Sequence, residues 1–423
     1  MGHADPLTVT DFLPVDQEQA ALGQLLFYDK ILSGNKNISC ASCHHPAFGS
    51  ADGLPLGVGE GGVGIGPKRT TGMGQDRISR RVPRNAPGLW NLGARSVTTL
   101  MHDGRISISN SYGNGFNTPA EEWLPEGLDS LLAAQALFPL TSEIEMRGDV
   151  EENEIAGAVN QRIDYGWPII AKRVRTLPGY GAKFVDAFDH IDHPEDVTIV
   201  EIVNAIAAFV SLEFRSFDSP YDRALTGDAQ ALNPEQQAGR ALFFGKGQCA
   251  SCHKGALFTD QSFHALGVPP LGPGRTRKFD LVARDLGHMG KSNLLEDAYK
   301  FRTPSLRNVA LTAPYGHNGA YPTLEAFLVQ HTDPQAAFDR FSPASVDLPS
   351  APWLLERDLA IWQNERELER QRAAIMPLQI DVTQAEIEKL VAFLNALTGE
   401  STNNLRFGVP VSVPSGLPVD TAE

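Results

Sequence analysis

The chain contains two copies of the pentapeptide Cys-x-x-Cys-His, which together use all four of its cysteines. The first copy is Cys40-Ala41-Ser42-Cys43-His44, and the second is Cys249-Ala250-Ser251-Cys252-His253. This spacing allows two thiols to form thioethers with the vinyl groups of one porphyrin while the adjacent histidine binds the iron. A redox dithiol or half of a zinc site could explain one copy. Two copies with no cysteine left over predict two covalently bound haem c groups.

The charge balance limits the partners of the chain. Its 36 Lys and Arg against 51 Asp and Glu give a net charge of -15, which argues against binding to nucleic acid or to an anionic membrane. No stretch approaches the length of a transmembrane helix, and we expect no membrane span. The first residues are not a signal peptide. Because haem c is normally attached after export, we expect a periplasmic protein whose leader has been removed.

The two halves of the sequence share a series of short motifs in the same order. The shared motifs are Gly23-x-x-Leu26-Phe27 and Gly239-x-x-Leu242-Phe243, Pro87-x-Leu89-x-Asn91 and Pro304-x-Leu306-x-Asn308, His102-x-Gly104 and His317-x-Gly319, and the helix starts Thr198-x-x-Glu201 and Thr383-x-x-Glu386. In each helix start, Thr or the preceding Asp (Asp196 or Asp381) can cap the helix, while Glu lies in the first turn. We therefore predict a mainly α fold with two pseudo-repeated, cytochrome c-like haem domains, residues 1–218 and 219–423, joined near Ser216 to Arg223.

Glycine and proline define the expected loops. The run from Gly53 to Gly74 is too rich in glycine for a helix or strand, and we expect a surface loop that shapes access to the first haem. The tail after Gly399 has few large apolar residues, and we expect it to be poorly ordered.

The sixth coordination position decides whether a haem carries electrons or reacts with peroxide. Near the first motif, His45 adjoins the proximal His44 and cannot reach the opposite face of the haem. Met73 and His102 are the alternatives that could fold over the iron; otherwise the first haem has an open position. For the second haem, His331 follows Leu324, Phe327 and Leu328 at helical spacing, so one helix face ends in an imidazole. Its rivals are His264, His288, Met289 and His317.

These motifs resemble the bacterial di-haem cytochrome c peroxidase family, which includes the MauG-type enzymes. The resemblance runs from about Gly23 to Leu397. Besides the two haem motifs it rests on Arg84-Asn85-x-Pro87-x-Leu89, His102-Asp103-Gly104-Arg105, Glu145-Met146, Thr303-Pro304-x-Leu306-Arg307-Asn308 and Ala313-Pro314-Tyr315-x-His317-x-Gly319.

The resemblance implies a peroxide site on the first haem, with Gln135, Pro139 and Glu145 in the distal pocket. A carboxylate such as that of Glu145 can move a proton from one peroxide oxygen to the other. The family also implies a calcium ion between the haems, bound by the Asn85 side chain and the carbonyl oxygens of Thr312 and Pro314. Oxygen donors of this kind suit calcium.

Three positions depart from the family pattern. The loop after the first haem lacks the His that blocks the iron in peroxidases requiring reductive activation. His331 occupies the position of Met in peroxidases and of Tyr in MauG. His102 replaces the Trp that bridges the haems, so either His102 bridges by hydrogen bonding or another aromatic residue, such as Trp90 or Trp123, takes that role.

Three functions remain open at this stage. The first is a MauG-type oxidoreductase that uses hydrogen peroxide to form high-valent haem iron and oxidises aromatic residues of a partner protein by long-range electron transfer. Relatives associated with copper-chelating peptides (methanobactins) also modify a partner protein. The second is a peroxidase that reduces hydrogen peroxide with electrons from a small cytochrome c or cupredoxin. The third is a di-haem electron carrier with two six-coordinate irons.

Overall fold

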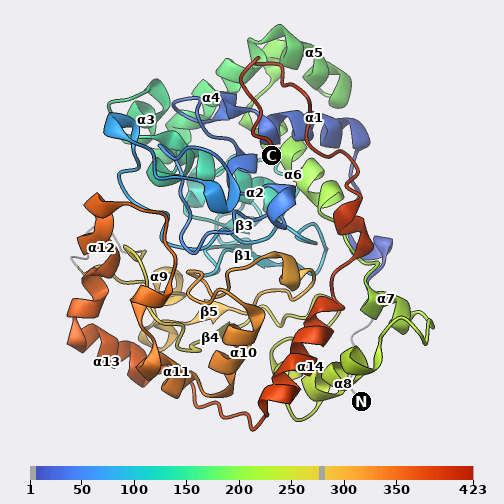
Figure 1. Cartoon of the computed structure of the whole chain (residues 1–423). Coiled ribbons are helices and arrows are strands. Elements are labelled where there is room, and N and C mark those ends of the chain that lie inside the picture. Colours follow the sequence, from blue (N-terminus) through green and yellow to red (C-terminus); the bar gives the residue numbers. More distant parts are fainter. Residues whose placement is uncertain (1–5, 276–281, 423) are drawn as a thin grey trace.

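The computed structural model of the chain describes residues 6–275 and 282–422, and it is mainly helical (Figure 1). Two small antiparallel sheets lie between the helices, in the order β1-β2-β3 and β4-β5. The strands are β1 (Thr99–Leu100), β2 (Ile106–Ile108), β3 (Phe116–Asn117), β4 (Phe263–His264) and β5 (Phe301–Arg302). The α-helices are α1 (Gln17–Tyr28), α2 (Leu131–Ala136), α3 (Glu154–Val159), α4 (Gly166–Arg175), α5 (Pro178–Ala187), α6 (Ile199–Glu213), α7 (Pro220–Leu225), α8 (Pro234–Phe244), α9 (Met289–Ser292), α10 (Leu324–Thr332), α11 (Pro334–Arg340), α12 (Leu355–Leu359), α13 (Glu365–Ala374) and α14 (Gln384–Asn395).

Each half contains one close helix crossing at a glycine. In the first half α1 packs on α6, and a Cβ atom on Gly23 would lie 1.8 Å from the Ala205 carbonyl oxygen. In the second half α8 packs on α14, and a Cβ atom on Gly239 would lie 1.9 Å from the Lys389 carbonyl oxygen. Only glycine lets two helix backbones approach this closely.

The starts of α6 and α14 confirm the predicted capping. Thr198 and Glu201 form a reciprocal capping box at α6, and Thr383 and Glu386 form the same box at α14. Each box satisfies backbone N–H groups that the first helical turn leaves unpaired. The two helices therefore begin where the sequence predicts.

The asparagines of the shared motifs make matching hydrogen bonds at the ends of these helices. The backbone N–H of Asn91 donates to the Phe214 carbonyl at 2.7 Å, and that of Asn308 donates to the Leu397 carbonyl at 3.1 Å. Both asparagines have a φ of 60°, and each side-chain oxygen accepts from the backbone N–H two residues after that carbonyl. These contacts support the division into residues 1–218 and 219–423, which stays a prediction.

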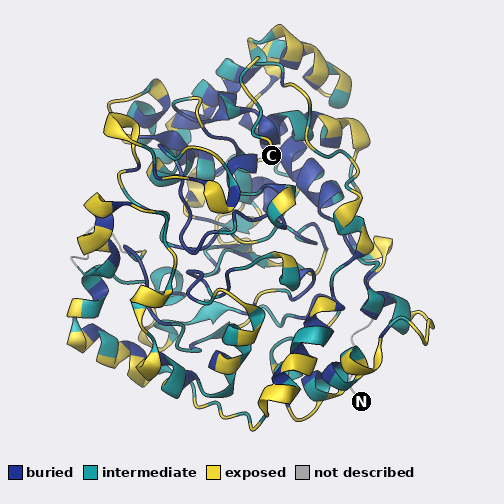
Figure 2. Cartoon of the chain, viewed as in Figure 1, coloured by how far each residue is buried: buried dark blue, intermediate teal, exposed yellow. Residues whose placement is uncertain are grey.

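The larger hydrophobic core lies in the first half, around α1, α2, α4 and α6 (Figure 2). The smaller core contains Tyr221, Phe243, Phe258 and Phe393, whose rings contact one another. Tyr221 belongs to α7. The expected linker from Ser216 to Arg223 therefore ends inside a helix that packs on the second half.

The tail after Gly399 is ordered, contrary to the expectation. It runs from α14 back to the first half, where it lies near α1 (Figure 1). Glu213 accepts hydrogen bonds from the backbone N–H groups of Phe407 and Gly408, and Val413 is buried in the first core. Asp420 pairs with Lys30 at 2.6 Å. A few buried contacts thus hold a segment whose composition resembles that of a flexible tail.

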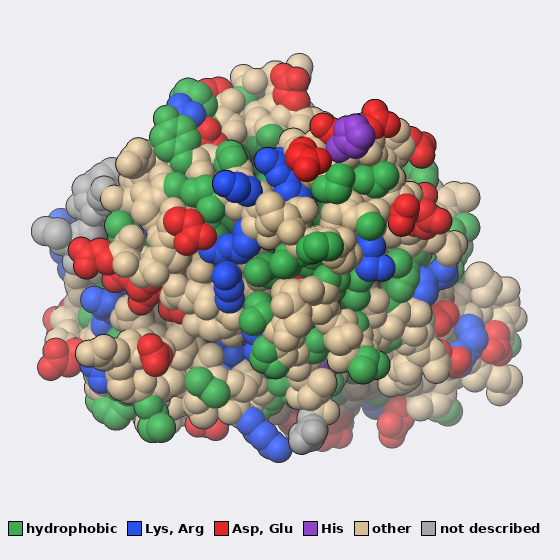
Figure 3. Space-filling view, turned by 90° about the horizontal axis from the view of Figure 1, so that it is seen from above, with side chains coloured by type: hydrophobic (Ala, Val, Ile, Leu, Met, Phe, Trp, Pro, Cys, Tyr) green, Lys and Arg blue, Asp and Glu red, His purple; other side chains and the backbone are tan. Residues whose placement is uncertain are grey.

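The glycine-rich loop is also less exposed than expected. Its first part is buried through Leu54, Leu56 and Val58, whereas most residues from Val63 to Gly74 are exposed. Seen from above, acidic and basic side chains are interspersed over this face of the molecule (Figure 3). Within the described ranges, every helix is too short or too polar to cross a bilayer.

Candidate haem-binding active site

The first haem motif has the geometry that haem attachment requires. Cys40 and Cys43 lie at a short turn after α1, and burial raises the pKa of both side chains to about 12. His44 Nδ1 donates to the Ser50 carbonyl at 3.0 Å, and burial lowers the pKa of its imidazole. The hydrogen bond fixes the neutral tautomer and leaves Nε2 as the metal donor. These residues fit a covalently bound haem.

A strained turn supplies the carbonyl that orients His44. Ser50 has a φ of 62° and is fully buried, and its hydroxyl oxygen accepts from the Leu89 N–H at 2.8 Å. Trp90 Nε1 donates to the adjacent Gly49 carbonyl at 2.9 Å. The structure thus places Trp90, one of the alternative bridging aromatics, in the wall behind the turn that orients the proximal histidine.

The second motif repeats this arrangement. His253 Nδ1 donates to the Phe258 carbonyl at 3.0 Å, and Phe258 has a φ of 54°. Burial, with a smaller contribution from His331, lowers the pKa of His253 to about 4. Both proximal imidazoles are therefore neutral, and both are oriented by the carbonyl of a non-glycine residue in the left-handed region.

His331 lies near the end of α10, on the helix that the sequence predicts. Its Nδ1 donates to the Phe327 carbonyl at 2.8 Å, which again leaves Nε2 free, and its ring stands edge-on to Phe327 at 4.6 Å. His331 is close enough to His253 to affect its pKa. This proximity is compatible with two imidazoles that bind one iron, and the assignment of His331 as a ligand stays a prediction.

The rival histidines have other contacts. His288 donates from Nδ1 to the Asp103 carbonyl at 2.8 Å and stacks on Phe263 at 3.6 Å. His317 stacks on Phe301 at 3.6 Å. These contacts place both rings against the β4–β5 strands.

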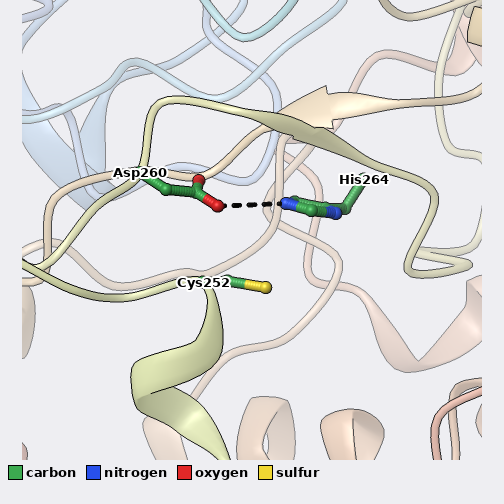
Figure 4. A group of neighbouring side chains, drawn as sticks. All are labelled: Cys252, Asp260 and His264. Atoms are coloured by element: carbon green, nitrogen blue, oxygen red, sulfur yellow. Dashed lines mark ion pairs between the residues drawn. The ribbon is translucent and has the colours of Figure 1, made fainter.

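His264 lies near Cys252 and Asp260, a group of donor atoms within 4.8 Å of one another that could hold a metal ion (Figure 4). His264 Nε2 is 3.5 Å from an Asp260 carboxylate oxygen. Because Cys252 belongs to the haem motif, its sulfur would be committed to a thioether. Only two donors then remain, which is too few for a structural metal site.

The predicted distal residues lie on one continuous series of turns. Gln135 is in the last turn of α2, Pro139 begins the next short turn, and Glu145 lies within a π-type turn from Glu143 to Arg147. The negative charge of Glu145 is one of the groups that raise the Cys43 pKa. The structure therefore places the charge of Glu145 near the first haem motif, and its role in the distal pocket stays a prediction.

The two alternative sixth ligands of the first haem, Met73 and His102, have other surroundings. Met73 is 88% exposed. His102 donates from Nε2 to the Asn85 carbonyl at 3.1 Å, and burial lowers its pKa to about 4. Both observations are consistent with an open first site.

The junction of the two halves contains a buried charge cluster that the sequence analysis missed. Arg84 binds Asp285 through two hydrogen bonds, at 2.7 and 2.8 Å, and lies 2.9 Å from Asp103. Its positive charge holds the pKa of Asp103 well below the usual range. His102 adjoins Asp103, and its backbone carbonyl accepts from the backbone N–H of Arg302 at 2.8 Å, so this residue contacts the second half. The only sequence features that pointed to this charge cluster were the Arg84-Asn85 and His102-Asp103 motifs.

The expected calcium ligands come from two neighbouring segments. The Asn85 N–H donates to the His317 carbonyl at 2.9 Å, which places Asn85 beside the segment that carries Thr312 and Pro314. Asn85 is buried, and its Nδ2 donates to the Leu54 carbonyl at 2.7 Å. Its Oδ1 is thereby left as the oxygen available to a cation, which fits the predicted role.

Trp123 is another of the alternative bridging aromatics. Its side chain is 44% exposed, and the Arg162 guanidinium lies 3.8 Å from the ring centroid. This exposure argues against Trp123 as the bridging residue, and the identity of the bridge stays a prediction.

Asp52 is a second residue that the sequence analysis missed. It is 1% exposed, one of its carboxylate oxygens has no hydrogen-bond partner, and burial raises its pKa to about 7. Its charge also contributes to the raised Cys43 pKa. An acidic residue soon after a haem motif was the only signal.

The sequence profile of the di-haem cytochrome c peroxidase family matches residues 17–230. The chain is 30% identical over 317 residues to methylamine utilization protein MauG of Methylorubrum extorquens, covering 74% of this chain and 69% of that protein. It is 28% identical over 309 residues to cytochrome c551 peroxidase of Pseudomonas aeruginosa, covering 72% and 69%. The chain belongs to the di-haem cytochrome c peroxidase family. It is therefore a haem-dependent oxidoreductase, and its family implies two haem cofactors.

A solved structure extends the likeness to almost the whole chain. A MauG-like protein associated with microbial copper homeostasis superposes with a TM-score of 0.63 at 28% identity, covering 96% of this chain and 97% of that one. The relatives thus include both MauG proteins and peroxidases, at similar identity.

Proposed function

We propose that the chain is a hydrogen peroxide-dependent oxidoreductase of the MauG type, which oxidises aromatic residues of a partner protein by long-range electron transfer. The observation that supports this proposal is the proximity of His331 to His253, together with the Nδ1 hydrogen bond of each ring to a backbone carbonyl. A thioether ligand raises a haem potential, whereas an imidazole lowers it and favours higher oxidation states. Such a site suits the storage of an oxidising equivalent better than the relay of electrons from a cytochrome.

Four cysteines and three histidines would hold the haem groups. Cys40 and Cys43 attach the first and Cys249 and Cys252 the second, while His44, His253 and His331 are axial ligands. When bound, the haems supply the peroxide and electron-transfer chemistry. Glu145 accepts a proton from one peroxide oxygen and returns it to the other, which leaves as water. Gln135 and Pro139 line the pocket beside that carboxylate. His102 links the two halves, because its backbone carbonyl accepts a hydrogen bond from the Arg302 N–H.

Two further assignments belong to the proposal. Asn85 Oδ1 and the carbonyls of Thr312 and Pro314 bind a calcium ion at the junction of the halves. The chain works in the periplasm, where haem c is attached.

The second candidate is a peroxidase that takes electrons from a small cytochrome c or cupredoxin. It uses the same peroxide pocket, and the sequence likeness to cytochrome c551 peroxidase favours it. The two candidates differ in whether the fully oxidised protein reacts with peroxide by itself.

A titration of the fully oxidised holoprotein with one equivalent of hydrogen peroxide, without reductant, tests the choice. Visible, near-infrared and EPR spectra would follow both haems. The MauG-type proposal predicts prompt loss of both ferric signals and a long-lived state that holds two oxidising equivalents. Reaction only after one haem is reduced would instead support the peroxidase. A wholly low-spin ferric spectrum with no reaction would indicate an electron carrier.

A further inference from the structure

Gly59 and Gly34 pack closely against the backbone of the π-type turn that carries Glu145. A Cβ atom on Gly59 would lie 1.9 Å from the Ile144 carbonyl oxygen and 3.0 Å from the Glu145 Cα. On the other side, a Cβ atom on Gly34 would lie 1.8 Å from the Arg147 carbonyl oxygen. The Gly34 N–H also donates to the Met146 carbonyl at 2.8 Å. The backbone around Glu145 is thus in direct contact with neighbouring chain on both sides.

Arg69 holds the segment that contains Gly59. Its side chain is 3% exposed, and its guanidinium donates to the carbonyls of Val58 at 2.5 Å, Gly59 at 2.8 Å and Gly64 at 2.5 Å. A planar fork with several fixed donors suits this task, whereas a lysine could satisfy fewer of these carbonyls. One buried side chain therefore fixes the part of the glycine-rich loop that touches the turn.

We propose that Gly59 and Arg69 are positioning residues that set the placement of the Glu145 carboxylate at the first haem. The inference rests on the proposed role of Glu145 in moving the peroxide proton. Proton transfer requires hydrogen-bond distance, and misplacement by about 1 Å can reduce a rate by about a hundredfold. A methyl group at position 59 would have to move away from the Ile144 carbonyl by more than that distance to reach ordinary contact.

This contact is suited to a clean experiment because Gly59 is not in the left-handed region. An alanine at position 59 would therefore press its methyl group on the Ile144 carbonyl, while the backbone of residue 59 itself stays unstrained. Gly157 in α3 offers a matched control, since the nearest atom to its Cβ position is the Val150 carbonyl oxygen at 3.9 Å. Arg69→Lys is a second test variant. It keeps a positive charge near Cys43 and removes the guanidinium that donates to the three carbonyls.

The test combines Gly59→Ala and Glu145→Gln in a double-mutant cycle on the holoprotein. The rates measured are those of the ferric protein with hydrogen peroxide and with cyanide, since HCN must also lose a proton as it binds. We expect Gly59→Ala to slow both by about 10- to 100-fold when Glu145 is present. In the Glu145→Gln background the same change should alter the rates by less than about twofold. Arg69→Lys should follow the same pattern, and Gly157→Ala should match the wild type.

The cycle separates failure of the inference from failure of the proposed proton role. Equal slowing by Gly59→Ala in both backgrounds would overturn the inference, because the contact would then act on something other than Glu145. Wild-type rates in both Gly59→Ala and Arg69→Lys, beside a slow Glu145→Gln, would also overturn it. Wild-type rates in Glu145→Gln would overturn the proton role and the inference together. Haem content and the ferric spectrum show that each variant is folded and loaded, and if Gly59→Ala does not fold, Arg69→Lys completes the cycle.

Discussion

Asp52 and Asp260 occupy matching positions in the two halves and differ in their affinity for a proton. Each lies two residues after the carbonyl that orients a proximal histidine, and each accepts a hydrogen bond from the backbone N–H two residues further on, from Leu54 at 3.0 Å and Ser262 at 2.9 Å. Burial raises the pKa of Asp52 to about 7. Hydrogen bonds and His264 lower the pKa of Asp260.

The two proximal turns match in their backbone, whereas their surroundings differ. The backbone turn, the left-handed residue and the histidine tautomer occur twice. The first half adds a glycine-rich loop and a carboxylate-bearing turn over its haem motif. The second half instead adds a helix that presents His331. Two matching proximal turns with different surroundings are what the proposed function requires of its two haem sites.

The largest expected effect is that of removing His331. His331→Ala should convert the second haem completely from low spin to high spin, because the proposed sixth ligand is lost, while the first haem should keep its spectrum. EPR and visible spectra of the ferric protein measure both. The change would make the two haems alike in coordination.

His288→Ala is the matched control for this change. It removes a neighbouring histidine that already donates from Nδ1 and stacks on Phe263, so the second haem should stay low spin. If low spin survived His331→Ala and was lost in His288→Ala, the ligand assignment would be wrong.

The next effect concerns the matching aspartates and the pH dependence of stability. The folded-state pKa of Asp52 is raised, so the protein loses stability as pH rises from the ordinary carboxyl value of 3.8 to about 7, and the loss is constant above that. The difference corresponds to on the order of 4 kcal/mol. Asp52→Asn should therefore raise the urea midpoint at about pH 8 and leave it nearly unchanged at about pH 4.

Asp260→Asn should act in the opposite direction. Its folded-state pKa is lowered, so its contribution is present above the ordinary carboxyl pKa and is lost as pH falls. The variant should be less stable than the wild type near neutral pH. Changes of the same sign in both variants would show that the two sites do not differ in the way their surroundings suggest.

Features with local sequence signals were predictable. These features depend on residues that are close together in the sequence. They are the capping boxes at Thr198 and Thr383, the helix that ends near His331, and the two Cys-x-x-Cys-His motifs. The approach of Glu145 to Cys43 followed from family spacing rather than from local pattern.

Features made by distant residues were not predictable. Asp52 is unusual only because the fold buries it, and Arg84 meets Asp285 from 201 residues away. The tail after Gly399 has the composition of a flexible segment, yet Glu213 and Lys30 hold it from the first half. Such contacts depend on the tertiary arrangement, which local sequence does not encode.

The smallest of these effects tests whether the helix crossings are equivalent. Gly23→Ala and Gly239→Ala place a methyl group 1.8 and 1.9 Å from a carbonyl oxygen of the facing helix, so the helices must move apart. Overpacking of this kind costs about 1–3 kcal/mol. Urea unfolding of the holoprotein, followed separately at each haem, should show each change chiefly at the haem of its own half.

Gly157→Ala, with room for its methyl group, should leave both transitions in place. If Gly239→Ala were as mild as Gly157→Ala while Gly23→Ala was destabilising, the two crossings would not be equivalent, and the second half would tolerate a wider helix separation than the first.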